Sequence, residues 1–423
     1  MADKRDLKIR QHKRTAGRTD ETDGNPPETG ADEGNADSGL RALPSRKKRR
    51  KGRSIFRLIF RLMLVAALVA GILFTYMNWD KIAPESLVIW LDEKLAGGQK
   101  GDGFPVEITG SAVLDMAETR DGLALLTDTS FLVYNSNGGE VLRRQHGFSS
   151  PILKTSGKWS LLAEAGGYRL RVESCAGTGA EMTLTNHIIG ASVGRSGNFA
   201  VCTDSAQGYT SEIVVYDSKK KVRYHRYISD LTILDVALSP DGNSVAAVGV
   251  TAEQGAMKSS ILLYNFDEEE PALQVDDADQ MLCAVEYFPG GTIAAVGDSA
   301  IWVVNASGTL RQKQGYGEKE LVGFAVGEKA ASLVLRSYGS TSGGELMAVN
   351  PSGDVAFTVS FEGTYRSIAP SSDGAVLLTS DHLYQTNVTG IQKTSDAPRD
   401  GRLVGTLGHK TIVLGLTALS EGE

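Results

Sequence analysis

The sequence predicts an all-β protein, a β-propeller preceded by one transmembrane helix. A unit of one strand, a Gly turn and two further strands recurs about every 40 residues, which is the spacing of propeller blades. Its clearest copy is LDVALSPDGNSVAAVG at residues 234–249, followed by ILLYNFD at 261–267. An apolar stretch of about 22 positions near the N-terminus is long enough to cross a bilayer.

The first strands of the units are predicted to begin near residues 113, 151, 188, 233, 282, 322, 365 and 403. Each leads into a short turn, because Gly adopts positive φ freely and Asp tolerates it. We interpret these positions as turn chemistry with no further role: Asp121, Gly122, Asp241, Gly242, Gly290, Asp373 and Gly374.

The second strands, such as LALLT from Leu123, are nearly continuous apolar runs, as expected for strands covered on both faces. The third strands alternate more and are predicted to be the outer strands. Aromatic residues recur where the third strands lie, and we expect them to pack between neighbouring blades rather than form a binding ladder: Tyr134, Tyr216, Tyr264 and Trp302.

The last unit is incomplete, because residues 403–416 supply only two strands by pattern. Residues 104–110 form a lone strand ahead of the first complete unit. A ring that shares one blade between its two ends hides the open strand edges, which otherwise invite aggregation. We therefore predict eight blades with a split closing blade, and seven blades as the alternative.

Four segments follow from composition. Residues 1–53 are poor in apolar residues and are predicted to be a disordered basic tail. Residues 54–79 are the transmembrane helix, 80–103 a stalk with a short amphipathic helix, and 104–423 the propeller. A cleaved signal peptide is the alternative for the apolar segment, although FTYMNW offers no small-residue cleavage site.

Charge predicts the orientation of the chain in the membrane. Residues 1–53 hold 15 Lys and Arg against 9 Asp and Glu, a net charge of +6, and they end in a basic run. That run comprises Arg46, Lys47, Lys48, Arg49, Arg50, Lys51 and Arg53. By the positive-inside rule, the N-terminus is cytoplasmic and the propeller extracellular in a single-pass cell-membrane protein. A nuclear-localisation or nucleic-acid patch is the alternative for the run.

Local motifs for catalysis, metals or cofactors are missing from the sequence. The six His have no ligand spacing, and the acidic clusters at 267–270 and 276–279 lack the spacing of a calcium loop. Cys175, Cys202 and Cys283 are too few for a disulfide framework, and we expect core thiols, with one bridge left open. We predict no cofactor, no metal and no catalytic residue, and the acidic propeller argues against nucleic acid as a partner.

The LSPDG turn at 238–242 and the apolar strand after it resemble the WD40-like and TolB-like repeats of bacterial propellers. The arrangement from Ser54 onward is similar to that of the DUF5711 family of bacterial membrane proteins. This resemblance implies one membrane helix, a short amphipathic helix and an extracytoplasmic propeller, and the tail before Ser54 lies outside it. It implies no catalytic residues. The Gly-His and Trp-Asp marks of true WD40 blades are missing here.

The leading functional hypothesis is a membrane-anchored binding or scaffold module without catalytic activity. Its partners would be the lipid bilayer through one helix and a protein or cell-wall component on the propeller, with the oligomeric state left open. The alternative is an enzyme, a hydrolase or a metal- or quinone-dependent enzyme, with its site on the propeller axis. A sensor is a third candidate. The insertions after Gly249, Asp267 and Tyr338 are where we expect a specific partner.

Overall fold

The computed structural model describes residues 60–66, 68–69, 71, 101–108, 110–253, 255–277, 280–305 and 307–422. The chain divides into two units, Met1–Met77 and Asn78–Glu423. The described residues of the first unit are helical. Within the described ranges, no helix has the length and apolar character needed to span a membrane. The predicted tail, most of the predicted membrane helix, residues 80–100 of the stalk and the basic run at 46–53 lie outside these ranges.

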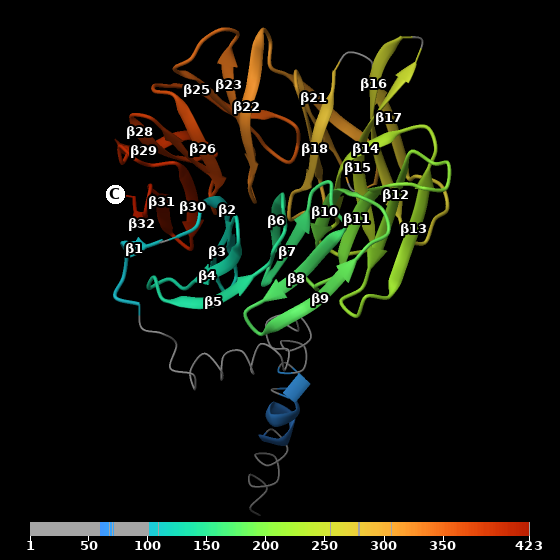
Figure 1. Ribbon diagram of the computed structural model, residues 1–423, viewed down its shortest axis with the longest axis horizontal. Helices are drawn as coiled ribbons and strands as arrows, with labels where there is room; N and C mark the ends of the chain where they lie inside the picture. The colour runs from blue at the N-terminus through green and yellow to red at the C-terminus, as the bar shows by residue number, and fades with distance from the viewer. Residues whose placement is uncertain are drawn as a thin grey trace, which may run out of the picture. The chain divides into compact units, whose positions relative to one another are not determined.

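The second unit contains a ring of eight four-stranded antiparallel sheets (Figure 1), so the prediction of an eight-bladed propeller is confirmed. We number the blades from the first complete one. Blade 1 comprises β2 (Val113–Thr119), β3 (Gly122–Thr127), β4 (Ser130–Tyr134) and β5 (Glu140–Gln145). Blade 2 comprises β6 (Pro151–Ser156), β7 (Trp159–Glu164), β8 (Arg169–Ser174) and β9 (Gly177–Thr183). Blade 3 comprises β10 (Ile188–Val193), β11 (Phe199–Asp204), β12 (Ser211–Tyr216) and β13 (Val222–Ile228).

The next three blades repeat the same order of strands. Blade 4 comprises β14 (Thr232–Leu238), β15 (Ser244–Glu253), β16 (Ala256–Asn265) and β17 (Leu273–Asp277). Blade 5 comprises β18 (Leu282–Tyr287), β19 (Ile293–Gly297), β20 (Ala300–Val304) and β21 (Leu310–Gly315). Blade 6 comprises β22 (Lys319–Val326), β23 (Ala331–Ser337), β24 (Gly344–Val349) and β25 (Val355–Phe361).

The last two blades bring the chain back to its start. Blade 7 comprises β26 (Tyr365–Pro370), β27 (Ala375–Thr379), β28 (His382–Asn387) and β29 (Gly390–Asp396). Blade 8 comprises β30 (Leu403–Leu407), β31 (Lys410–Leu414), β32 (Ala418–Glu421) and β1 (Val106–Glu107). In this blade, Val106 is paired with Leu419, so the N-terminal strand completes a sheet made by the C-terminal end of the chain.

The split blade was predicted, but its composition differs from the prediction. The C-terminal segment supplies three strands rather than two, because Ala418–Glu421 forms β32 between β31 and β1. The lone N-terminal strand is limited to Val106–Glu107. With four residues and few apolar ones, β32 lacks the pattern that marks the other strands of the blade.

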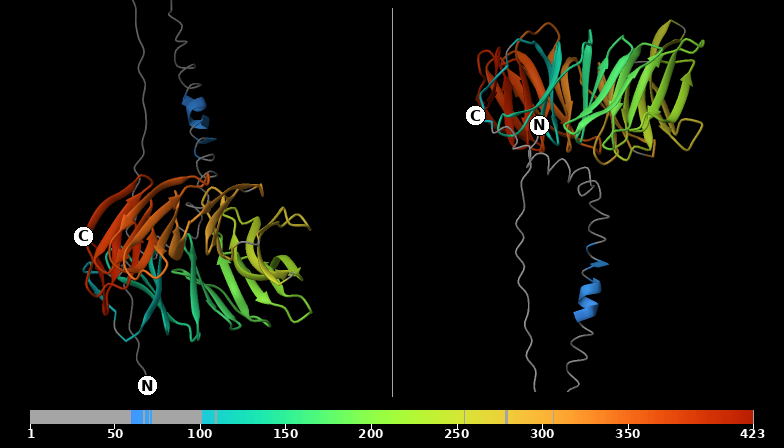
Figure 2. Two further views of the ribbon diagram at one scale, coloured as in Figure 1. Left: turned by 90° about the horizontal axis from the view of Figure 1, so that it is seen from above. Right: turned by 60° about the horizontal axis from the view of Figure 1, so that its bottom comes forward.

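The first strand of each blade is innermost and the fourth is outermost (Figure 1). The strands run across the thickness of the ring in the turned views of Figure 2. The prediction that the third strands are the outer ones was wrong, since β4 and β20 are buried along their full length. The fourth strands, which the repeat pattern did not reveal, consist mostly of half-buried and exposed residues, as β5 does.

The core lies between blades, because each sheet packs both its faces on its neighbours. Tyr134 packs with Leu407 and Ile412 of blade 8, and Trp302 packs with Ala246 and Val248 of blade 4. Tyr264 and Tyr216 also pack at blade interfaces. The interpretation of these four aromatic residues as packing is therefore confirmed.

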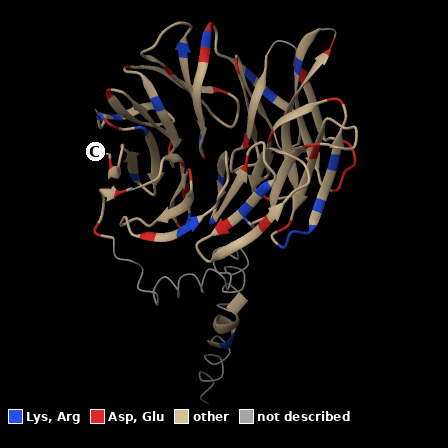
Figure 3. Ribbon diagram, viewed as in Figure 1, with Lys and Arg blue, Asp and Glu red and all other residues tan. Residues whose placement is uncertain are grey.

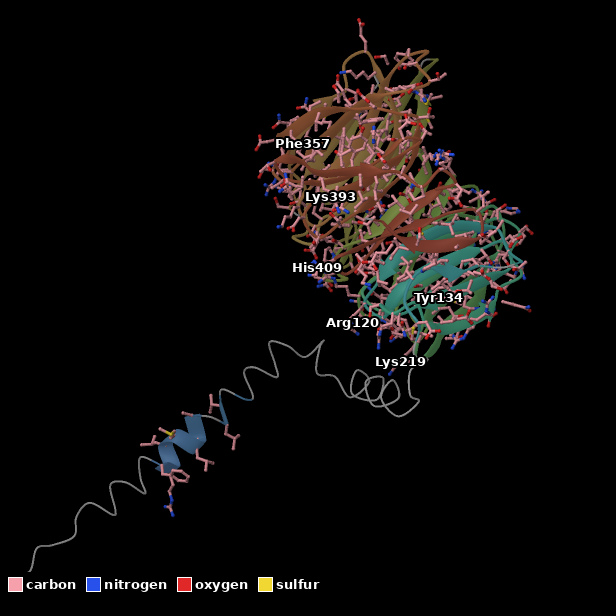
Figure 4. The ribbon with its side chains drawn as sticks, turned by 90° about the vertical axis from the view of Figure 1, so that its left-hand side faces the viewer. Arg120, Tyr134, Lys219, Phe357, Lys393 and His409 are labelled. Atoms are coloured by element: carbon pink, nitrogen blue, oxygen red, sulfur yellow. The ribbon has the colours of Figure 1, made fainter. Side chains whose placement is uncertain are left out.

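The ring has two different faces. We call the side with the first-to-second and third-to-fourth strand turns the turn face; Figure 4 labels Arg120, Lys219 and His409 from three of these turns. We call the opposite side, with the second-to-third strand loops and the connections between blades, the loop face. The chain joins the ring on the turn face, where Gly103 N–H donates to the Asn137 carbonyl of blade 1 at 3.0 Å.

Candidate functional site

The sequence-derived turn positions all lie on the turn face, each between a first and a second strand. Gly242 has φ 73°, and Gly122, the first residue of β3, has φ 147°. In blade 5, the left-handed conformation belongs to Gly291 (φ 84°) rather than to Gly290. Gly374 is not left-handed, but a Cβ there would lie 2.5 Å from the Thr386 carbonyl oxygen. These glycines therefore serve different local needs.

The three Asp residues of these turns also have individual contacts. Asp241 Oδ1 accepts hydrogen bonds from the Ser239 hydroxyl at 2.6 Å and from Asn243 N–H at 3.1 Å. The hydrogen bond from Ser239 is the main cause that lowers the pKa of Asp241 below its usual value. Asp373 pairs with Lys329 of the neighbouring blade. Burial raises the pKa of Asp121, and Cys175 of blade 2 opposes that change by hydrogen bonding.

Two cavities open among these turns. One of about 430 Å³ lies between blades 4 and 5 and includes Asp241, Asp267, Glu268 and Tyr287 in its lining. The other, of about 240 Å³, lies between blades 7 and 8 and includes Asp373 and Lys410. Both linings are rich in hydroxyl, amide and carboxylate groups. Neither has the mostly apolar wall typical of small-molecule sites.

Four charged side chains from the innermost strands form an axial charge cluster: Asp115 of blade 1, Lys154 of blade 2, Asp235 of blade 4 and Glu286 of blade 5. Lys154 Nζ lies 3.7 Å from Glu286 Oε1, so this ion pair joins two blades that are not neighbours. The two side chains are 35% and 38% exposed, and we assign that exposure to the central channel because innermost strands border the axis.

The surrounding protein shifts the pKa of every member of the cluster. Desolvation raises the pKa of Asp115, Asp235 and Glu286, and attraction to Lys154 opposes the change in each case. Burial disfavours the charged form of Lys154, but the carboxylates of Glu286, Asp235 and Asp115 prevail and raise its pKa. Lys154 therefore stays protonated at neutral pH, which excludes it as a nucleophilic amine in this state.

A repeated irregularity of the first strands places two members of the cluster, Asp115 and Asp235, at equivalent positions. In six blades, the pairing of the first and second strands shifts by one residue, a β-bulge whose unpaired residue lies near the loop face. Asp115 and Asp235 directly follow the bulge in blades 1 and 4. The unpaired residue of blade 5 is Cys283, which is exposed, so the expectation of a core thiol there was wrong.

Cys202 is buried, as expected, and all three Cys are free thiols. In the parts of the chain that the structure describes, no group of three or more His, Cys, Asp or Glu could hold a metal ion. The axial charge cluster was missed in the sequence, because a single charged residue within an apolar strand belongs to no motif. The one signal in the sequence was that Asp115 and Asp235 occupy the same position of the repeat, each in the first strand of its blade.

The loop face carries large exposed apolar and aromatic side chains on or directly beside the second-to-third strand loops of five blades. Tyr338 of blade 6 and Leu416 of blade 8 are 72% and 69% exposed. The others are Tyr168 of blade 2, Tyr209 of blade 3 and Met257 of blade 4. The remaining exposed apolar residues of the ring are aliphatic, and most lie at the start of outer strands: Val141, Val222, Leu310 and Val355.

Charge does not single out a surface in the same way, since Lys and Arg alternate with Asp and Glu around the ring (Figure 3). In blades 1, 5 and 7, the second and third strands are joined by two residues, one of which is Asp: Asp128, Asp298 and Asp381. The apolar loops and the acidic turns thus share one face. Apolar and aromatic side chains of this kind are typical of protein-binding surfaces.

The family model described as "Family of unknown function (DUF5711)" matches residues 106–400, which span the propeller from β1 to the end of blade 7. No curated protein matches the sequence.

Several solved structures match this chain. The C-terminal WD40 domain of Sif2 has a TM-score of 0.51 and 11% identity, and the match covers 76% of this chain and 99% of that one. BamB from Moraxella catarrhalis has a TM-score of 0.46 and 12% identity, covering 75% and 100%. A eukaryotic initiation factor has a TM-score of 0.42 and 12% identity, covering 74% and 91%. At such identities, the similarity to the Sif2 domain concerns the WD40-like propeller fold alone.

Proposed function

The chain belongs to DUF5711, a family of unknown function, and we propose that it is a membrane-anchored binding module without catalytic activity. Residues 54–79 anchor it in the cell membrane, the tail at 1–53 is cytoplasmic, and the propeller lies outside the cell. The propeller binds a protein partner of the cell envelope through its loop face. This arrangement follows from the apolar segment and the basic run that precedes it.

One observation carries the proposal: the two most exposed large apolar side chains of the ring, Tyr338 and Leu416, both lie on the loop face. Burying such side chains in a partner's pocket is a main source of binding free energy, and Tyr is enriched among energetically dominant contacts. The chain joins the ring on the turn face. The loop face is therefore the side of the ring opposite to that connection.

The test uses the full chain, crosslinked in its native membranes and purified through an affinity tag. We expect one specific partner with the natural sequence, and at least a tenfold loss of its capture when Tyr338→Ser and Leu416→Ser are combined. The matched control combines Val222→Ser and Val355→Ser, which remove two exposed apolar side chains from outer strands. Equal capture by the two double variants contradicts the assignment of the loop face.

A further inference from the structure

The turn face is divided by charge, although basic and acidic residues alternate around the ring as a whole (Figure 3). In blades 1–3, the turns of this face contain six basic residues against two acidic ones, a net charge of +4. In blades 4–8, they contain one basic residue against eight acidic ones, a net charge of −7. We call the turns of blades 4–8 the acidic sector and those of blades 1–3 the basic sector. The basic residues of the basic sector are Arg120, Lys158, Arg195, Lys219, Lys220 and Lys221.

The basic sector is one continuous strip of turns. The backbone N–H of Arg120 in blade 1 donates to the Gly157 carbonyl of blade 2 at 2.8 Å. A Cβ on Gly157 would lie 3.9 Å from Arg195 Cγ of blade 3, so these three turns are in contact one after another. In blade 3, Phe199 is paired with Tyr216. The turn before Phe199 and the turn after Tyr216 therefore lie side by side at the same end of the sheet.

The two acidic residues of the basic sector do not balance its positive charge. All the basic residues are exposed except Lys158, which is half-buried. Burial raises the pKa of Asp121, and the charges of Arg120 and Lys158 oppose this rise, so two cations share one carboxylate. Asp217 holds its own turn, because its Oδ1 accepts the backbone N–H of Lys219 at 2.9 Å. An excess of positive charge therefore remains on the surface of blades 1–3.

One of these Lys residues stands where the fold favours Gly. The third-to-fourth strand turns of blades 1, 3, 5 and 6 share one conformation, in which the fourth turn residue donates its N–H to the carbonyl of the first. That fourth residue has positive φ in each of them: Gly138 (73°), Lys220 (67°), Gly308 (80°) and Gly353 (93°). Of the residues that the structure describes, Lys220 is the one non-Gly residue with positive φ. A side chain is strained in this conformation, so folding does not explain the Lys.

The chain enters the ring through the basic sector. Gly103 N–H donates to the Asn137 carbonyl in the third-to-fourth strand turn of blade 1. A ring anchored through residues 54–79 is therefore tethered at the sector that carries the positive charge. Anionic lipid headgroups attract Lys and Arg close to a membrane, and each such residue strengthens binding about fivefold. The acidic sector is repelled by the same surface.

We infer that the basic sector docks on an anionic lipid surface, with blades 1–3 against the headgroups and blades 4–8 tilted away from them. The groups it recognises are the phosphates of an anionic phospholipid such as phosphatidylglycerol. A membrane surface is broad and flat, so the basic residues need only share one face and do not have to converge on a pocket. The inference rests on the proposed function for the anchor at residues 54–79 and for nothing else.

The test uses the full chain in nanodiscs of phosphatidylcholine, with or without about 30% phosphatidylglycerol. In a background of Cys175→Ser and Cys283→Ser, a donor dye is attached through Ser196→Cys in the basic sector or Ser372→Cys in the acidic sector, both exposed positions. Energy transfer to an acceptor on the lipid headgroups is then measured. We expect phosphatidylglycerol to raise transfer from the basic sector at least twofold and not from the acidic sector. About 0.5 M NaCl should reverse the rise, because salt screens the attraction.

The variants separate docking from folding. Lys220→Gly should raise the melting temperature, since it removes the strain, while it weakens the effect of phosphatidylglycerol. Combining it with Lys219→Gln and Lys221→Gln should lower the ratio of docked to undocked ring at least tenfold. The matched control neutralises three basic residues outside the basic sector and should leave that ratio unchanged: Arg311→Gln, Lys329→Gln and Lys393→Gln.

Three outcomes overturn the inference: no effect of phosphatidylglycerol on the basic sector, equal effects on both sectors, or an equal loss in the matched control. Binding of soluble polyphosphate without any effect of phosphatidylglycerol also overturns it and assigns the sector to another anion. A full chain recovered apart from the discs contradicts the anchor, and hence the proposed function. Flotation with phosphatidylglycerol vesicles, but not with phosphatidylcholine vesicles, then supports lipid docking by itself, and failure to float refutes it.

Discussion

At the scale of single residues, the glycines of the turns show how far local reasoning extends. Positive φ was expected in the short turns, and Gly242 has it, whereas in blade 5 it belongs to Gly291. The dihedral of each position depends on turn length, and turn length depends on where the pairing of the strands ends. That ending is set by the sheet and cannot be derived from the turn residues alone.

Replacing Gly242 by Val should destabilise the ring by about 1–3 kcal/mol, because a β-branched residue is strained at φ 73°. Its Cβ would also lie 2.8 Å from Asn198 Nδ2. Thermal unfolding of the variant measures the effect. Gly290→Ala is the control, since its Cβ meets nothing within 4 Å and its φ is not positive. Equal melting temperatures for the two variants would refute the turn assignment.

The axial charge cluster makes stability depend on pH. The pKa values of Asp115, Asp235 and Glu286 are raised by desolvation in the folded state. Their contribution to stability is therefore present below about pH 4, the usual pKa range of carboxyls, and is lost as pH rises through the raised values. Lys154 limits this loss, because its charge favours the ionised carboxylates.

Lys154→Met should lower the free energy of unfolding by roughly 1 kcal/mol more at pH 7 than at pH 4, allowing for solvent screening in the channel. Without the ammonium group, the pKa values of the three carboxyls rise further. The stability that is lost as these carboxyls ionise is then larger, and the loss continues to higher pH. Chemical denaturation at the two pH values provides the measurement. Adding Asp235→Asn to Lys154→Met should restore part of the stability at pH 7, and a further decrease would contradict the mechanism.

At the scale of strands and blades, the buried strands were identified and the outer ones were missed. Second strands such as β19 are apolar along their full length because neighbouring blades cover both faces. The fourth strands lie at the outer edge, where β21 is almost entirely exposed. A strand with so little burial has no apolar pattern.

The insertion expected after Gly249 proves to be a continuation of β15 and β16, which stay paired as far as Glu253 and Ala256.

The packing between blades predicts a large effect for Trp302, which is fully buried between blades 4 and 5. Trp302→Ala should destabilise the ring by about 3–5 kcal/mol through lost burial and the cavity left behind. Differential scanning calorimetry of the variant tests this value. Tyr338→Ala, at an exposed aromatic residue, should change the melting temperature little, and comparable losses would place the core elsewhere.

At the scale of the whole molecule, closure depends on a short C-terminal strand. β32 lies between β31 and β1, so it is the element through which the two ends of the chain meet. A chain that ends at Thr417 lacks β32 and leaves two strand edges open. We expect it to aggregate or to melt well below the natural chain, as light scattering during heating would reveal. A chain ending at Glu421 keeps β32 and serves as the control.

The proposed membrane orientation can be tested with natural cysteines. Cys283 is exposed and Cys202 is buried. In a Cys175→Ser background, a membrane-impermeant maleimide should label intact cells through Cys283, and Cys283→Ser should abolish the signal. Partial desolvation raises the pKa of Cys283, so labelling should still accelerate as pH rises beyond the usual pKa range of thiols. Labelling that requires lysed cells would place the propeller in the cytoplasm.

The sequence by itself determined the fold class, the eight-bladed ring and its split closing blade. It did so because burial on both faces and tight turns leave a repeated local pattern in every blade. Only the tertiary structure decided which side chains share a surface. Lys154 meets Glu286 three blades away, and Tyr168 of blade 2 meets His187 at the start of blade 3. Such contacts depend on ring curvature, bulges and loop paths, which no local pattern encodes.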